Sequence, residues 1–155
     1  MHNARWSVDG RFHGLCAEVL IAGSRVRLLQ PETFMNRSGV AVARLADYFR
    51  IDVAQILVVH DELDFAVGVV RAKKGGGHAG HNGLKDIIAH LGSRDFYRLR
   101  IGIGRPTPPQ SVVDYVLSAP PRNDREKIQQ AITMACGNMD LLIDEQLARF
   151  AEALC

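Results

Sequence analysis

The stretch Ile56-Leu57-Val58-Val59-His60-Asp61-Glu62-Leu63-Asp64 decides the fold class. Its first four residues form a short, continuous apolar run, which is typical of a strand that is covered on both faces. The run leads directly into His60, Asp61 and Glu62, so carboxylates are expected at the C-terminal end of this strand. Ligands of open α/β sheets usually bind at that end, because the loops there form a crevice. The stretch therefore predicts an α/β fold with a polar site beside Asp61.

The residues that follow extend the α/β pattern. Residues 69–74 have the pattern of a second strand, and residues 75–83 form a loop too rich in glycine to be regular. A helix is predicted over 84–91, because its apolar residues recur at the i, i+3, i+4, i+7 spacing of one buried face. Residues 98–103 alternate between apolar and other side chains, which predicts a strand with one basic face.

The residues before the central stretch predict a hairpin and a helix. Residues 15–21 and 25–29 have the pattern of two strands, and the loop at 22–24 contains a glycine that suits a left-handed turn. Ser38 is expected to cap a helix that continues to about residue 50. The apolar stripe of this helix is typical of ordinary core residues.

The C-terminal part of the chain, after a proline-rich break at 106–109, is predicted to be helical. A short helix is expected over 111–117, and the longest helical pattern, over 128–143, should pack on the sheet. No internal repeat interrupts the chain. We therefore predict a single α/β domain over residues 1–155, with a twisted mixed β-sheet flanked by helices.

The composition excludes several classes of protein. Of the 155 residues, 47% are hydrophobic and 23% are charged, a balance that indicates neither a disordered chain nor a membrane protein. No apolar run approaches the roughly 20 residues that cross a bilayer, and the start lacks the apolar core of a signal peptide. We expect a cytoplasmic protein whose three separated cysteines are reduced thiols.

The net charge of +2 conceals an uneven distribution. Residues 71–105 hold eight basic and two acidic side chains, which gives +6, whereas residues 1–70 and 106–155 are net acidic. Clustered lysine and arginine favour a partner that carries phosphates, because binding releases counterions. The charge taken alone fits a solvated basic face equally well.

The first of three polar clusters is Phe34-Met35-Asn36-Arg37-Ser38, which precedes a predicted helix. One interpretation is that Asn36 helps to cap that helix. The other is that its carboxamide, which both donates and accepts hydrogen bonds, holds a carbonyl group or a water molecule.

The second cluster is the polar end of the central stretch, residues 60–64, and three interpretations are open. It could be a solvated turn, a metal site, or the carboxylate that orients a catalytic histidine. A metal site is disfavoured, because no second group of ligands stands at a familiar spacing.

The third cluster is the glycine-rich loop, which contains His78, His81 and Asn82 and has lysines on both sides. Glycine lets backbone amides approach an anion closely, and the N-terminus of the following helix adds partial positive charge. The pattern matches neither a Walker loop nor the Rossmann fingerprint, and Asn82 could simply cap the helix.

Taken together and in order, these clusters resemble the bacterial-type peptidyl-tRNA hydrolases. The resemblance runs from about Trp6 to at least Leu117. Four blocks carry it: Leu29-Gln30-Pro31-Glu32-Thr33-Phe34-Met35-Asn36-Arg37-Ser38-Gly39, His60-Asp61-Glu62-Leu63-Asp64, Gly75 to Asp86, and Arg98 to Gly104.

The resemblance implies hydrolysis of the ester that joins a peptide to the 3′ ribose of tRNA, without a metal or other cofactor. In the family a histidine acts as general base on water, and the aspartate matching Asp61 stabilises the productive state of that histidine. The asparagines matching Asn36 and Asn82 line the site, and the positions of Phe34 and Met35 form its wall.

The resemblance also implies the partner. Lys73 and Arg100 match basic positions that resemble a clamp for the 5′-phosphate of tRNA, so the expected partners are peptidyl-tRNA and the tRNA acceptor end. No membrane association is expected, and we expect a monomer.

The start of the chain departs from the family. Family members open with a strand, a glycine-rich turn containing Asn-Pro, and a His-Asn pair that includes the general base, and none of these precedes Trp6. His2-Asn3 copies the pair but stands only a few residues before Trp6. We therefore expect the first family strand and the catalytic histidine to be missing, and hydrolysis by this chain alone to be weak or absent.

Two alternatives to an intact enzyme follow from the residues. The fold could serve as a non-catalytic domain that binds the tRNA acceptor or another phosphate. The glycine-rich loop could instead belong to an unrelated phosphate-binding enzyme.

Overall fold

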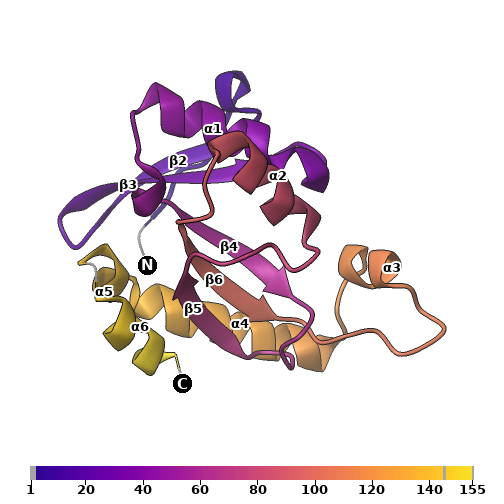
Figure 1. Ribbon diagram of the computed structural model, residues 1–155. Helices are drawn as coiled ribbons and strands as arrows, with labels where there is room; N and C mark the ends of the chain where they lie inside the picture. The colour runs from indigo at the N-terminus through magenta and orange to yellow at the C-terminus, as the bar shows by residue number, and fades with distance from the viewer. Residues whose placement is uncertain (1–2, 145, 155) are drawn as a thin grey trace. The chain divides into compact units, whose positions relative to one another are not determined.

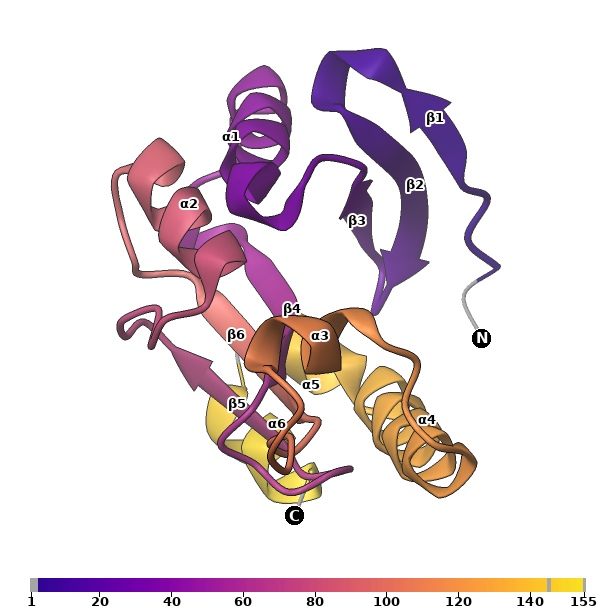
Figure 2. The same ribbon diagram turned by 90° about the vertical axis from the view of Figure 1, so that its right-hand side faces the viewer.

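The computed structural model describes residues 3–144 and 146–154, and the side chain of Asn36 is not described. The chain folds into two compact units. Unit 1 comprises Met1–Leu57 and Lys74–Tyr97, and unit 2 comprises Val58–Lys73 and Arg98–Cys155. Figure 1 labels the α-helices and the strands β2 to β6, and Figure 2 also labels β1.

Unit 1 contains an antiparallel three-stranded sheet in the order β1-β2-β3, which Figure 2 shows side by side. Its strands are β1 (Ser7–Asp9), β2 (Gly14–Ile21) and β3 (Ser24–Pro31). The predicted hairpin is confirmed, but its turn is two residues long rather than three. Ala22 and Gly23 have φ angles of 52° and 77°, which suits the two-residue turns whose twist matches that of paired strands.

Two helices of unit 1 pack against each other, α1 (Ser38–Tyr48) and α2 (Asn82–Leu91). Their apolar stripes are buried as predicted, including Leu45 at 8% and Leu84 at 3% exposure. The expected cap of α1 is wrong, because Ser38 is the first helical residue and Arg37 occupies the capping position. The Ser38 hydroxyl donates instead to the Met35 carbonyl oxygen at 2.8 Å. Helix α2 ends as expected at Gly92, with a φ of 70°.

Three short 3₁₀ helices connect the elements of unit 1. They are η1 (Gly10–Phe12), η2 (Met35–Arg37) and η3 (Val53–Gln55). The second of them, η2, leads directly into α1 and contacts α2.

The second sheet has the strand order β4-β6-β5. Its strands are β4 (Leu57–Glu62), β5 (Val70–Lys74) and β6 (Tyr97–Gly102). Strands β4 and β6 run parallel, because the Tyr97 and Ile103 amides donate to the carbonyls of Ile56 and Glu62 at a constant offset. Strand β5 runs antiparallel to β6, as the bonds from the amide of Gly75 to the Phe96 carbonyl and from the amide of Gly102 to the Val69 carbonyl indicate.

The α/β class and the mixed sheet are therefore confirmed, but the strands form two sheets rather than the single one expected. The physical reason is that β2 pairs on both sides with strands of its own neighbourhood, β1 and β3. Local pairing of this kind satisfies its backbone donors and acceptors without the central sheet.

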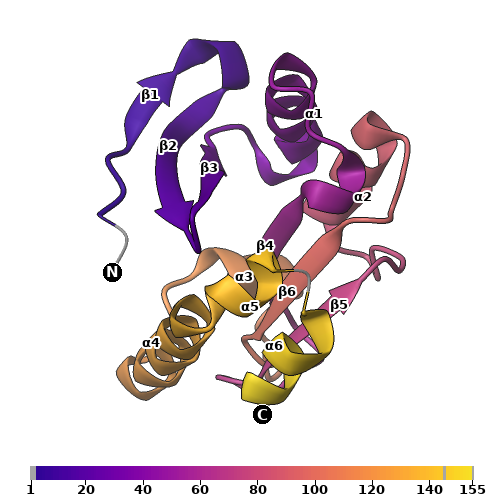
Figure 3. The same cartoon turned by 90° about the vertical axis from the view of Figure 1, so that its left-hand side faces the viewer.

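The helices of unit 2 are α3 (Val112–Leu117), α4 (Arg122–Gly137), α5 (Met139–Ile143) and α6 (Leu147–Ala153). The predicted helix over 128–143 is interrupted at Asn138, whose side-chain amide donates to the Met134 carbonyl oxygen at 2.9 Å. Helix α4 runs along the β4-β6-β5 sheet in Figures 1 and 3, as expected for its apolar stripe. Within the described residues, no helix is both long and apolar enough to cross a bilayer.

Candidate active site

The turn before α1 presents two large apolar side chains to solvent. Phe34 precedes η2 and is 82% exposed, and Met35, its first residue, is 59% exposed. Exposed apolar side chains that lie together often mark a binding surface. The backbone of Asn36 lies in η2, but its side chain is outside the described part of the structure. The two interpretations of the Asn36 carboxamide therefore stay predictions.

The start of α2 carries Asn82 as its first residue. The residue in the capping position is His81, whose Nδ1 accepts from the Leu84 amide at 3.2 Å. The alternative in which Asn82 caps the helix is thus wrong, and the Asn82 side chain is exposed. The preceding loop needs its glycines, since Gly75, Gly76 and Gly80 have φ angles of 75°, 103° and 80°.

The first and third polar clusters lie side by side in unit 1, because η2 packs against α2. This close packing of η2 on α2 requires a glycine at position 83. A Cβ atom at Gly83 would stand 2.6 Å from the Met35 sulfur, which is closer than real Cβ contacts allow. The Met35 side chain therefore rests against the first turn of α2, next to Asn82.

Residues 60–62 of the second cluster belong to β4, which ends at Glu62, and residues 63–64 lie in the turn that follows. Asp61 is the last residue but one of this strand and is half-buried. The His60 ring nitrogen Nδ1 contacts the Asp61 carbonyl oxygen at 2.8 Å. The exposed Asp64 forms an ion pair with Arg105. Among the acids of this cluster, Asp61 is therefore set within the sheet, whereas Asp64 is engaged at the surface.

A cationic cluster, defined here as Lys73, Arg98 and Arg100, lies on neighbouring strands β5 and β6. Arg98 is 1% exposed, so this arginine of the predicted basic face does not face solvent. The Arg100 guanidinium lies 4.9 Å from the centre of the Phe65 ring. Its Nε is buried and has no hydrogen-bond partner among the described residues.

The surroundings of Lys73 lower the pKa of its ammonium group. Burial is the largest cause, and the positive charges of Arg100 and Arg98 add to it, while Glu62 acts in the opposite direction. A cation held among other cations is stabilised when an anion approaches. The cluster is therefore electrostatically suited to a phosphate.

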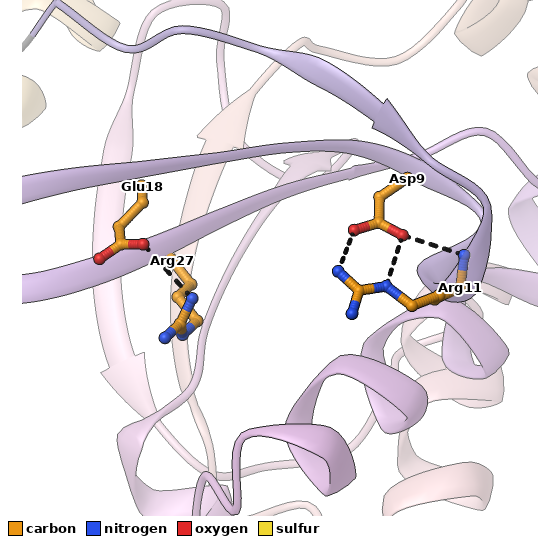
Figure 4. A network of polar contacts seen from close by, with 4 residues as sticks. All are labelled: Asp9, Arg11, Glu18 and Arg27. Atoms are coloured by element: carbon orange, nitrogen blue, oxygen red, sulfur yellow. Dashed lines mark hydrogen bonds and ion pairs between the residues drawn. The ribbon is translucent and has the colours of Figure 1, made fainter.

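The sequence reasoning missed one polar network in unit 1, which Figure 4 shows. Arg11 bonds the Asp9 carboxylate at 2.7 and 3.0 Å, and this bond is the largest cause that lowers the Asp9 pKa. Glu18 pairs across the sheet with Arg27 at 3.5 Å. The sequence could have indicated the second of these pairs, because Glu18 and Arg27 are opposite charges at matching positions of the predicted hairpin.

Metal ligands do not gather in the described residues: no group of three or more His, Cys, Asp and Glu side chains there could hold an ion.

Helix α2 holds a further carboxylate, Asp86, whose contact the sequence did not indicate. Its contact partner, Gly39, stands 47 positions away in the sequence. Spacing within one helix gives no signal for such a contact.

Comparison with known proteins gives a consistent result. The family model described as "Peptidyl-tRNA hydrolase" matches residues 1–154. A relative from Histophilus somni named "Peptidyl-tRNA hydrolase" is 47% identical over 153 residues, which are 98% of this chain and 79% of that protein. One of the same name from Shewanella amazonensis is 49% identical over 148 residues, covering 95% of this chain and 76% of the relative.

A solved structure agrees with these relatives. The crystal structure of peptidyl-tRNA hydrolase from Acinetobacter baumannii matches with a TM-score of 0.93 at 40% identity. The match covers 99% of this chain and 78% of the other.

The match to the family begins at residue 1 of this chain. We had expected the first family strand and the histidine segment to be missing, and this family match does not bear out that expectation. His2, from the pair that copies the His-Asn motif, lies outside the described residues.

Proposed function

This chain belongs to the peptidyl-tRNA hydrolase family, and from that membership we propose that it hydrolyses the ester bond of peptidyl-tRNA. Water adds to the ester carbonyl carbon, the bond to the 3′ oxygen of tRNA breaks, and a free peptide acid and tRNA leave. The observation that carries the proposal is the match to the family over nearly the whole chain. The same observation disfavours the alternative of a non-catalytic tRNA-binding domain.

The test is release of the peptide from a short N-acetylated peptidyl-tRNA by the 155-residue chain. We expect release faster than in buffer alone. Binding of the substrate without release would support the non-catalytic alternative. The expectation of weak hydrolysis rested on a missing histidine segment, which the family match does not bear out, and the measured rate tests the expectation directly.

We propose that Phe34, Met35, Asn36 and Asn82 bind the peptide part of the substrate. The exposure of Phe34 and Met35 beside the start of α2 supports this assignment. An apolar wall next to a carboxamide suits a peptide, because the wall covers side chains and the carboxamide bonds the backbone.

Replacing Asn82 with alanine is expected to raise KM for peptidyl-tRNA about tenfold, since the loss of one hydrogen bond in a binding site costs about 1.4 kcal/mol. Steady-state peptide release measures this change. Asn123→Ala, an exposed asparagine of α4, is the matched control and should leave KM unchanged. An unchanged KM in Asn82→Ala would remove Asn82 from the peptide site.

We propose that Asp61 is the carboxylate that orients the general-base histidine and stabilises its protonated form. Its position near the end of β4 and its partial burial support this role, because a carboxylate that is partly shielded from water interacts more strongly with an imidazolium. Asp61 does not attack the ester in this mechanism.

We propose that Lys73 and Arg100 bind a phosphate of tRNA. Two observations support this assignment. Lys73 lies among positive charges, which a bound anion would balance. The buried Nε of Arg100 could donate a hydrogen bond to the same anion. Contacts of this kind fix the position of the tRNA without reading its sequence.

Lys73→Ala and Arg100→Ala are each expected to weaken the binding of deacylated tRNA and to make its affinity less dependent on salt, by about one unit of slope. Lys127→Ala, an exposed lysine of α4, is the control. Binding titrations at several salt concentrations measure both effects.

Because the Lys73 pKa is lowered, raising the pH should remove its charge earlier than that of an ordinary lysine. The wild-type affinity should therefore fall with rising pH more than that of Lys73→Ala, and equal pH profiles would contradict the assignment.

We also propose that the protein acts as a monomer in the cytoplasm. The substrate class supports the location, because peptidyl-tRNA arises during translation. Sedimentation equilibrium tests the oligomeric state, and a concentration-dependent mass would contradict it.

A further inference from the structure

We propose that Asp86 is a positioning residue, which fixes the turn at Phe34–Arg37 against the start of α2 and so holds the peptide site in shape. This inference rests on the proposed function, because it assigns a role within the same site. Neither the helical pattern around Asp86 nor the roles that the family resemblance implies had assigned it a part in the site.

The carboxylate of Asp86 joins the two helices directly. Its Oδ2 accepts from the Gly39 amide of α1 at 2.7 Å, although Asp86 itself stands on α2. Gly39 is the second residue of α1, so this amide is one that the helix cannot bond internally. A carboxylate at a helix N-terminus is also favoured by the helix dipole. The bond is therefore charge-assisted and belongs to the stronger class of hydrogen bonds.

The Asp86 side chain is mostly buried, and the backbones of α1 and α2 lie close together around this bond. The side chain is 19% exposed, and its other oxygen lies 3.3 Å from His90 Nδ1. Gly39 allows the approach, because a Cβ atom there would stand 2.3 Å from the Asp86 carbonyl oxygen. The first turn of α1 is thus held against the middle of α2 by both the side chain and the backbone of Asp86.

The Gly39 contact extends to the proposed peptide site through two neighbouring residues. Ser38 donates its hydroxyl hydrogen to the Met35 carbonyl oxygen at 2.8 Å, which ties the turn to the start of α1. The Met35 sulfur fills the space above Gly83 on α2. The turn is therefore anchored at one end by Asp86 and at the other by Gly83, with Phe34 exposed beside it.

The first test separates positioning from folding. Asp86→Ala should raise KM for a short N-acetylated peptidyl-tRNA about tenfold or more, because a charge-assisted bond that shapes the site is lost. Its affinity for deacylated tRNA should stay within about twofold of wild type, since the cationic cluster is left intact. Asp86→Asn keeps an oxygen that can accept from Gly39 and should restore KM to within about threefold. Asp47→Ala, an exposed carboxylate of α1, is the matched control.

The second test does not depend on hydrolysis. Amide hydrogen exchange followed by NMR should show the Gly39 amide exchanging about tenfold faster in Asp86→Ala, with amides of β2 and β3 unchanged. If the wild-type chain released no peptide, the proposed function would fail, and the exchange data would still decide whether Asp86 anchors the turn.

Two results would overturn the role. The first is an Asp86→Ala variant with unchanged KM and unchanged exchange at Gly39. The second is a variant in which KM, kcat and the affinity for deacylated tRNA all worsen together and Asp86→Asn gives no rescue, because that pattern means general loss of structure.

Discussion

Asp61→Asn is expected to lower kcat/KM for peptidyl-tRNA by about 10²-fold or more. Asparagine has nearly the shape of aspartate but lacks the negative charge. The histidine would lose the partner that fixes its tautomer and stabilises its imidazolium form. Peptide release under single-turnover conditions measures the loss in the chemical step.

The control for Asp61→Asn is Asp140→Asn, an exposed aspartate on α5 that should leave the rate unchanged. Both variants should bind deacylated tRNA as the wild type does. An Asp61→Asn variant with the wild-type rate would show that the carboxylate orients nothing needed for hydrolysis.

Gly39→Ala is expected to lower the free energy of unfolding by about 2–3 kcal/mol, although it adds only one methyl group. The new Cβ would stand 2.3 Å from the Asp86 carbonyl oxygen and 2.7 Å from His90 Nδ1. The carbonyl belongs to a helix backbone and cannot turn aside, so α1 and α2 would have to separate. Thermal unfolding should show a fall in Tm of about 5–10 °C for a chain of this length.

Gly137→Ala makes a matched control for the same chemical change. Gly137 is the last residue of α4, and a Cβ atom there would meet nothing within 4 Å. Alanine favours helix, so the free energy of unfolding should stay the same or rise by less than about 1 kcal/mol. A Gly39→Ala variant as stable as Gly137→Ala would contradict the tight packing of α1 on α2.

Local patterns predicted most of the elements because short-range periodicity reflects which face of an element is buried. The hairpin at β2 and β3, helix α2 with its end at Gly92, and the strands β5 and β6 all followed from such patterns. The division of the strands into two sheets did not, because it depends on which strands pair at long range. The break between α4 and α5 was also missed, since the apolar spacing continues across Asn138.

The candidate site was predictable to a similar degree. The motifs pointed to Met35 and Asn82, which lie together in unit 1, and to Asp61, which lies in β4. No local pattern predicted the contact of Asp86 with Gly39 or the burial of Arg98. Both depend on contacts between separate elements, whereas alternation along β6 predicted only that Arg98 and Arg100 share one face.

The cationic cluster combines the guanidinium groups of Arg98 and Arg100 with the ammonium group of Lys73. Arginine side chains in general carry a permanent positive charge in proteins, whereas lysine can lose its proton when it is buried. Lys73, with its lowered pKa, responds to the surrounding acidity and to bound anions. Its proton would be taken up when a phosphate arrives and released when the phosphate leaves. Association with tRNA should therefore carry a measurable proton uptake in alkaline buffer, centred on one lysine.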